Sequence, residues 1–223
     1  MGKKKNDRLP DIKKAGDSAG LYLHAAMDMA KKLSSGAVSS YRSVFSIERK
    51  SEIGYYRSRG ISNAKKGRFE DAAELLESVC KETPNDAEAV YYYGASLMKL
   101  NRNEEAVEAL EAARKLNKRD LRTASTLGMV YINMKAYDKA VSVLEDARGV
   151  DANNFSIQYR LGLAYDNISE HAKAIKAFEE ALRIKPEAAN VYQAMGFAYE
   201  QSDDKQNAVQ CFKKALELEE STK

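Results

Sequence analysis

Five glycines recur at intervals of 34 residues and set the plan of most of this chain: Gly60, Gly94, Gly128, Gly162 and Gly196. Twelve residues after each glycine stands an alanine, and four residues further on comes a leucine or a phenylalanine. A period of this length indicates copies of one supersecondary unit, each too small to bury its own apolar face alone. The sequence therefore predicts five contiguous units, covering residues 53–86, 87–120, 121–154, 155–188 and 189–222.

Each unit is expected to form two helices, A and B, that pack against each other. In the fourth unit, apolar residues at helical spacing predict helix A over 159–167 and helix B over 172–184. Gly162 then lies opposite Ala174, and Phe178 fills the space beside them. Small residues in these columns let the two helix backbones approach closely.

The turns between the expected helices agree with this interpretation. Polar pairs mark the A-to-B turns, and Pro84 and Pro186 stand where helix B should end, because proline lacks the N–H and clashes with the preceding turn. Spacing, small-residue columns and turns together match the tetratricopeptide repeat. The predicted fold is all-α, a right-handed superhelical solenoid of five helix-turn-helix repeats preceded by an N-terminal degenerate helical pair.

The junction at 117–121 lacks the proline found at the equivalent positions of two other junctions. Without that helix stop we expect it to be more compliant. The sequence therefore predicts a hinge here, between the first two units and the last three.

The N-terminal part divides into a basic tail and a helical segment. Residues 1–14 carry six basic residues against two acidic ones, which is typical of a disordered tail or, alternatively, of a weak contact with anionic lipid. Residues 15–52 predict a degenerate repeat, with one helix to about residue 33 and a second over 38–47. Its apolar residues cap the first unit, insert into another copy or belong to a disordered segment: Leu21, Leu23, Met27, Met29 and Phe45.

Helix A of each unit should line the inner, concave wall of such a solenoid. The residues expected there are basic near the first units, apolar in the middle and acidic to amide-rich at the far end: Arg57, Lys65, Asp86, Tyr91, Met98, Lys99, Met129, Asn133, Tyr159 and Asn167. This pattern suits an extended peptide or an amphipathic helix. The alternative is that many apolar wall residues only pack against the adjacent helix A.

Two of these wall residues, Arg57 and Asp86, should meet where the first two units join. Either they form an ion pair that fixes the local shape, or Arg57 receives a carboxylate from a partner. A clamp for the C-terminal carboxylates of heat-shock proteins is disfavoured, because it needs lysine and asparagine at wall columns that are apolar here or contain no lysine.

No arrangement in the sequence indicates an enzyme, a metal site or a cofactor. His24 and His171 have no Cys, Asp or Glu at metal-ligand spacing, and no phosphate-binding glycine loop or G-x-S-x-G motif occurs. Cys80 and Cys211 are expected to be free thiols, as in a reducing compartment. Beyond the tail the charge is close to zero, which disfavours nucleic acid as a partner, and no apolar run is long enough to span a bilayer.

Several runs go beyond the generic repeat: 55–65 (YYRSRGISNAK), 159–167 (YRLGLAYDN), 198–201 (AYEQ), 211–220 (CFKKALELEE) and 21–33 (LYLHAAMDMAKKL). They resemble the MamA family, the tetratricopeptide proteins of bacterial magnetosomes, and the resemblance covers roughly residues 20–220. It implies a non-catalytic scaffold that self-assembles through its N-terminal segment, here about 19–49. It also implies a peripheral coat on the cytoplasmic face of the magnetosome membrane, where the scaffold recruits other magnetosome-associated proteins. Arg57 and Asp86 match the family's concave surface.

The competing hypothesis is a monomeric adaptor that binds peptide tails of a chaperone or secretion client.

Overall fold

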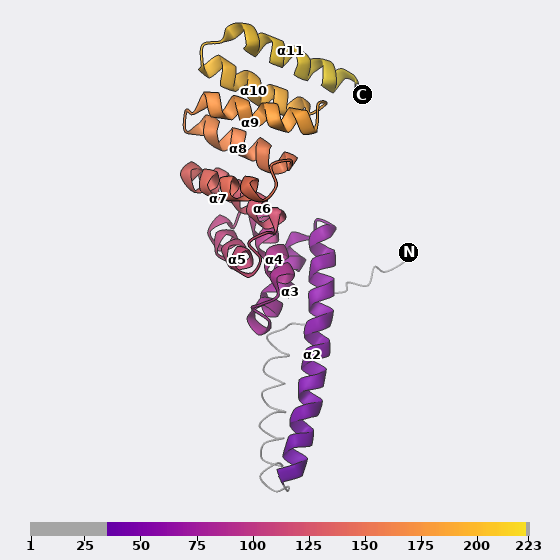
Figure 1. Ribbon diagram of the computed structural model, residues 1–223. Coiled ribbons are helices and arrows are strands. Elements are labelled where there is room, and N and C mark those ends of the chain that lie inside the picture. Colours follow the sequence, from indigo (N-terminus) through magenta and orange to yellow (C-terminus); the bar gives the residue numbers. More distant parts are fainter. Residues whose placement is uncertain (1–34, 222–223) are drawn as a thin grey trace, which may run out of the picture. The chain divides into compact units, whose positions relative to one another are not determined.

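The computed structural model describes residues 35–221, and side-chain surroundings from residue 49 onward (Figure 1). The chain divides into two compact units between Glu52 and Ile53. Every element of the described part is a helix: α2 (Ser35–Lys65), α3 (Phe69–Glu82), α4 (Ala87–Lys99), α5 (Asn103–Leu116), α6 (Leu121–Asn133), α7 (Tyr137–Val150), α8 (Phe155–Asn167), α9 (His171–Ile184), α10 (Ala189–Gln201) and α11 (Lys205–Ser221). None of these helices is long and apolar enough to cross a membrane.

The predicted solenoid of five tetratricopeptide repeats is confirmed. From residue 53 onward the helices alternate as A and B, and each packs on the helix before it and the helix after it (Figure 1). The expected helices of the fourth unit end where α8 and α9 end, at Asn167 and Ile184. Successive A helices also pack on one another, α4 on α6, α6 on α8 and α8 on α10, whereas successive described B helices show no comparable packing. The array therefore curves with its A helices on the inside.

The repeating glycine is the point of closest contact within each unit. A Cβ added at any of the five glycines would lie less than 3.0 Å from the leucine or phenylalanine sixteen residues later. At Gly162 the nearest atom is Cε1 of Phe178, at 2.3 Å, and Phe178 is fully buried. Backbone and ring are thus in direct contact, as the small-residue column predicts.

The N-terminal helix differs from the prediction. A separate helix over 38–47 was expected, followed by helix A of the first unit, but α2 runs without a break from Ser35 to Lys65. The reason is local: between residues 47 and 54 the chain has neither proline nor a turn motif that would stop a helix. Gly54 lies within the helix, and no close contact requires a glycine there, since an added Cβ would meet nothing within 4 Å. The expected first helix and break of this segment lie outside the described residues.

Each A-to-B turn contains one residue in the left-handed region, again every 34 residues. Gly67 has φ 78°, and its equivalents are not glycines: Asn101 (59°), Lys135 (58°), Ser169 (63°) and Asp203 (59°). Left-handed backbone is strained for residues with a Cβ, less so for asparagine and aspartate. Only the first unit uses the residue that fits without strain.

Replacing Ser169 by glycine is therefore expected to stabilise the array by about 0.5–1 kcal/mol, since relief of strain outweighs the greater freedom of glycine in the unfolded chain. The matched control is Asn101→Gly, which should gain less because asparagine tolerates this conformation. Urea unfolding followed by circular dichroism measures both. Equal gains, or a loss at Ser169, would contradict the explanation.

The B-to-A junctions are closed by hydrogen bonds and side-chain caps. At 117–120 the amide of Asn117 donates to Ala113 O (2.9 Å) and that of Asp120 to Asn117 O (3.3 Å). The proline-containing junction at 83–86 has the same two bonds, at 2.7 and 3.1 Å. The junction without proline is thus built like its neighbour, and a hinge at 117–121 stays a prediction.

A hydrogen bond between a tyrosine and a glutamate links consecutive units. Tyr131 donates to Glu111, and Tyr165 donates to Glu145, each at 2.5 Å and across 20 residues of sequence. Burial, followed by the bond to glutamate, raises the pKa of each tyrosine to about 12. The same contact therefore fastens the second unit to the third and the third to the fourth.

Candidate functional site

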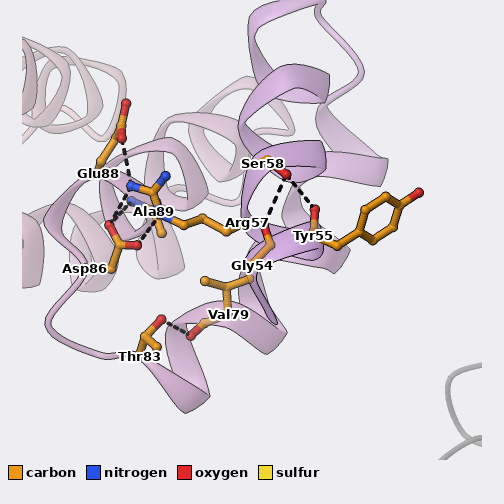
Figure 2. A network of polar contacts seen from close by, with 9 residues as sticks. All are labelled: Gly54, Tyr55, Arg57, Ser58, Val79, Thr83, Asp86, Glu88 and Ala89. Atoms are coloured by element: carbon orange, nitrogen blue, oxygen red, sulfur yellow. Dashed lines mark hydrogen bonds and ion pairs between the residues drawn. The ribbon is translucent and has the colours of Figure 1, made fainter. Parts of the chain in front are cut away.

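The candidate site is the inner wall formed by the A helices. Its first part is an ion cluster where the first two units meet (Figure 2). Arg57, on α2, donates from Nε to Asp86 Oδ2 (2.5 Å) and from Nη2 to Asp86 Oδ1 (3.2 Å) and Glu88 Oε2 (2.8 Å). Asp86 also caps α4 by accepting from the amide of Ala89 (3.1 Å). The expected pair of Arg57 and Asp86 thus exists, joined by Glu88.

The charges of this cluster favour a shape-fixing role over capture of a carboxylate. The Arg57 guanidinium, through its hydrogen bonds, is the main cause that holds the pKa of Asp86 below its usual range. Asp86 and Glu88 in turn raise the pKa of Arg57. Arg57 already faces two carboxylates, so the cluster has a surplus of negative charge and a further carboxylate would be repelled. A binding role for Arg57 itself stays a prediction.

Replacing Asp86 by asparagine should flatten the acid end of the pH–stability curve. The folded pKa of Asp86 is depressed, so its contribution is present above the unfolded value of about 3.9 and is lost as pH falls through the folded value. The free-energy difference between wild type and variant should be constant at pH 5–7 and shrink below about pH 4. Urea unfolding at several pH values measures this. Curves that stay parallel down to pH 2 would contradict it.

The second part, which we call the central cluster, consists of Tyr91, Arg122, Ser125, Tyr159 and Arg160. The guanidinium carbon of Arg122 lies 5.0 Å from the centre of the Tyr91 ring, and Arg122 Nε is 3.1 Å from Asp120 Oδ1. Arg160 reaches from α8 to α6, where Nη1 donates to the hydroxyl of Ser125. Tyr91 and Tyr159 are half-buried. The cluster combines aromatic surface with two guanidinium groups.

Cations also lie over aromatic rings on either side of the central cluster. The ammonium nitrogen of Lys65 is 5.3 Å from the Tyr92 ring, and that of Lys185 is 4.5 Å from Phe155, which stacks on Tyr159. Such contacts add about 0.5–1 kcal/mol each at exposed sites. A partner laid along the wall would therefore meet aromatic faces and positive charge together.

The other predicted wall residues do not converge on one point. Met98 and Met129 are half-buried, and Met98 packs against the core, as the alternative interpretation of the apolar residues proposed. Lys99, Asn133 and Asn167 are exposed near the ends of their helices. Their role in binding stays a prediction. The assembly residues Leu21, Leu23, Met27 and Met29, and the side chain of Phe45, lie outside the described residues.

Sequence reasoning missed Glu88, Arg122 and Arg160. Arg160 occupies a repeat column that otherwise holds Ser58, Tyr92, Thr126 and Ala194, so a charged residue stood out there. Arg122 and Glu88 share a column with Gly54, Ser156 and Asn190, and their opposite charges were not considered. A search of every helix A column for charged residues would have found all three.

The isolated reactive groups have structural surroundings. Cys80 and Cys211 are free, as expected, and burial raises the pKa of Cys80 to about 12, so its thiol is unreactive. His171 lies with Nδ1 2.8 Å from Asp166 Oδ1. Within residues 35–221, no three His, Cys, Asp or Glu side chains are grouped so that they could hold a metal ion.

Comparison with known families gives three matches. The family described as "Anaphase-promoting complex, cyclosome, subunit 3" matches residues 65–147, and two families described as "Tetratricopeptide repeat" match residues 126–189 and 189–222. All three fall on the array.

Curated relatives point to one group. Magnetosome protein MamA of Magnetospirillum gryphiswaldense is 38% identical over 78 residues, which are 35% of this chain and 36% of the relative. Magnetosome protein MamA of Paramagnetospirillum magneticum is 37% identical over the same shares. These alignments thus span little more than a third of the relatives' length.

Solved structures extend the similarity over the array. The structure named "MamA MSR-1 C2" is 33% identical, with a TM-score of 0.68, and the match covers 77% of this chain and 98% of that one. For "Crystal structure of MamA protein" the identity is 32%, the TM-score 0.68 and the coverage 76% and 92%. With this identity over nearly the whole of those structures, the chain belongs to the MamA family of tetratricopeptide repeat proteins.

Proposed function

We propose that this protein is a non-catalytic scaffold that self-assembles and recruits partner proteins at the surface of magnetosomes. The observation that carries the proposal is the inner wall, where A helices packed side by side present a strip of aromatic and charged side chains. Extended concave surfaces of this kind are what solenoid proteins use to bind other chains. The magnetosome enters through the similarity to MamA proteins.

Self-assembly is proposed to run through residues 15–52. The array from Ile53 has its own buried clusters, so it does not need this segment to form a core. The segment contains large apolar residues outside the array, including Leu21, Met27 and Met29. An apolar segment that its own array does not require is available to bind a second copy.

Light scattering coupled to size-exclusion chromatography tests assembly. The full chain should elute as large assemblies, and a variant without residues 1–49 should elute as a monomer that keeps its helical circular dichroism. The matched variant without residues 1–14 removes only the basic tail and should still assemble. A monomeric full chain would instead favour the adaptor that binds peptide tails of a chaperone or secretion client.

Location on the cytoplasmic face of the magnetosome membrane, through a protein partner, is part of the same proposal. Purified protein should sediment with magnetosome membranes, and protease treatment of those membranes beforehand should abolish the binding. Binding that survives protease and falls in high salt would point to anionic lipid and the basic tail instead. Removal of residues 1–14 should leave binding to intact magnetosomes unchanged.

A further inference from the structure

Arg160 differs from the arginines around it because its half-buried guanidinium has no acidic partner within residues 49–221. Its Nη1 donates to the hydroxyl of Ser125, and Ser125 is only 6% exposed. The groups whose charge acts on it are the hydroxyls of Tyr91 and Tyr159, and no carboxylate within residues 49–221 forms an ion pair with it. Burial lowers the pKa of Arg160, whereas carboxylates raise those of Arg57 and Arg122.

A half-buried cation without a counter-charge destabilises the free protein, because part of its hydration is lost without compensation. Arginine keeps its charge at all ordinary pH values, so Arg160 cannot escape the penalty by losing a proton. One hydroxyl satisfies one of its five N–H donors, and a hydroxyl brings no counter-charge. An anion that binds beside it would therefore be stabilised by charge and by unused donors at once.

The surroundings define the anion. Among the five residues of the central cluster, Arg160 alone keeps a charge that no carboxylate neutralises, since Asp120 pairs with Arg122. Further along the same wall, Asp86 and Glu88 together outweigh the charge of Arg57. A single carboxylate matches this balance, whereas a phosphate with nearly two charges does not. Tyr91 and Tyr159 lie near enough for their hydroxyls to act on the guanidinium, and both are half-buried. Their exposed parts offer apolar surface for the residues that flank such a carboxylate.

We propose that Arg160 is the anchor for one Asp or Glu side chain of a partner peptide held on the inner wall, with apolar residues next to that acid. The inference rests on the proposed function, in that the wall must bind a protein segment. It adds the specificity: the central cluster selects an acid flanked by apolar residues, and the Arg57 cluster does not. Ser125 acts by orienting Arg160 rather than by touching the partner.

Random 12-residue peptides displayed on phage are the probe, selected in parallel on the full-length wild type and on Arg160→Gln. Peptides selected on wild type should share an Asp or Glu beside apolar residues, and this preference should vanish with Arg160→Gln. A synthetic selected peptide should bind wild type about 10- to 100-fold more tightly than its Glu→Gln (or Asp→Asn) twin, the range expected of a hydrogen bond to a charged group. With Arg160→Gln the two peptides should bind alike.

Two further variants separate anchoring from a structural role. Arg160→Lys keeps the charge and should retain part of the acid preference. Arg183→Gln, which removes an exposed arginine of α9 that pairs with Glu180 outside the central cluster, should retain nearly all of it. Thermal unfolding without peptide should show Arg160→Met at least as stable as wild type, because it removes a half-buried charge that has no counter-charge. A fall in stability would make Arg160 a structural link between α8 and α6 and would overturn the proposal.

The outcomes also separate this inference from the proposed function. Selected peptides without an acidic preference, or with a preference that Arg160→Gln leaves intact, overturn the anchor while the wall remains a peptide-binding surface. Failure of any peptide to be enriched over a bare support overturns both the anchor and the binding role of the wall.

Discussion

Replacing Phe178 by alanine is expected to cost the protein about 3–5 kcal/mol of its free energy of unfolding, the usual price of removing a fully buried phenylalanine. Phe178 has no exposed surface, and its ring packs directly on the backbone at Gly162 and lies 6.2 Å, centre to centre, from the ring of Tyr159. Tight packing leaves neighbouring groups little freedom to fill the resulting cavity. The loss of unfolding free energy should therefore be close to the sum of two contributions, the transfer free energy of the removed ring and the cost of the cavity that it leaves.

Phe212 provides the matched control for this prediction. It occupies the same column in the fifth unit and also faces a glycine, Gly196, but it is only half-buried. Phe212→Ala should therefore cost less, about 1–2 kcal/mol by the apolar area removed from contact. Urea unfolding monitored by circular dichroism gives both values. Equal losses would show that burial within a unit does not determine its contribution.

Replacing Gly162 by alanine should destabilise the array by about 1–3 kcal/mol, although alanine is the better helix former. The added Cβ would lie 2.3 Å from Cε1 of Phe178, closer than atoms tolerate, so the ring or the helix must move. Phe178 is fully buried and has nowhere to go. Strain should thus exceed the gain in helix propensity, and the melting temperature should fall.

Gly149→Ala is the control with the opposite expected sign. Gly149 lies within α7 and a Cβ there would meet no atom within 4 Å, so alanine should stabilise by about 0.5–1 kcal/mol. In the double variant Gly162→Ala, Phe178→Ala the new methyl group has room. The two losses should then sum to more than the loss measured for the double variant. Additive losses would refute contact between this glycine and this ring as the cause.

Most of the fold could be predicted because the information lies in single columns of the repeat. Gly162 and Phe178 stand sixteen residues apart as their equivalents do in every unit, and that spacing is what brings backbone and ring together. The continuous α2 was missed because helix A of the first unit was assumed to begin at its unit boundary, whereas helix formation depends on whether a break is present. No residue near 47–54 supplies one.

The candidate site was less predictable, since its key groups are exceptions to the repeat. Arg57 and Asp86 could be paired from their columns, but the approach of Glu88 depends on the direction of a long side chain. Arg160 was overlooked because its column holds Ser58, Tyr92, Thr126 and Ala194 in the other units and was not counted as part of the wall. Its lack of an acidic partner is a property of the folded surroundings, which a linear pattern does not contain.

Packing within a repeat and binding at its surface depend on different columns of the repeat, and this separation affects how such proteins evolve. The glycine and its leucine or phenylalanine hold a unit together, while Tyr91, Arg122 and Arg160 lie in other columns. Mutations in the wall columns can therefore change the binding specificity of one repeat at a time. They leave the packing of the two helices in that repeat unchanged. Descendants of a common ancestor are free to acquire new clients while keeping the same skeleton.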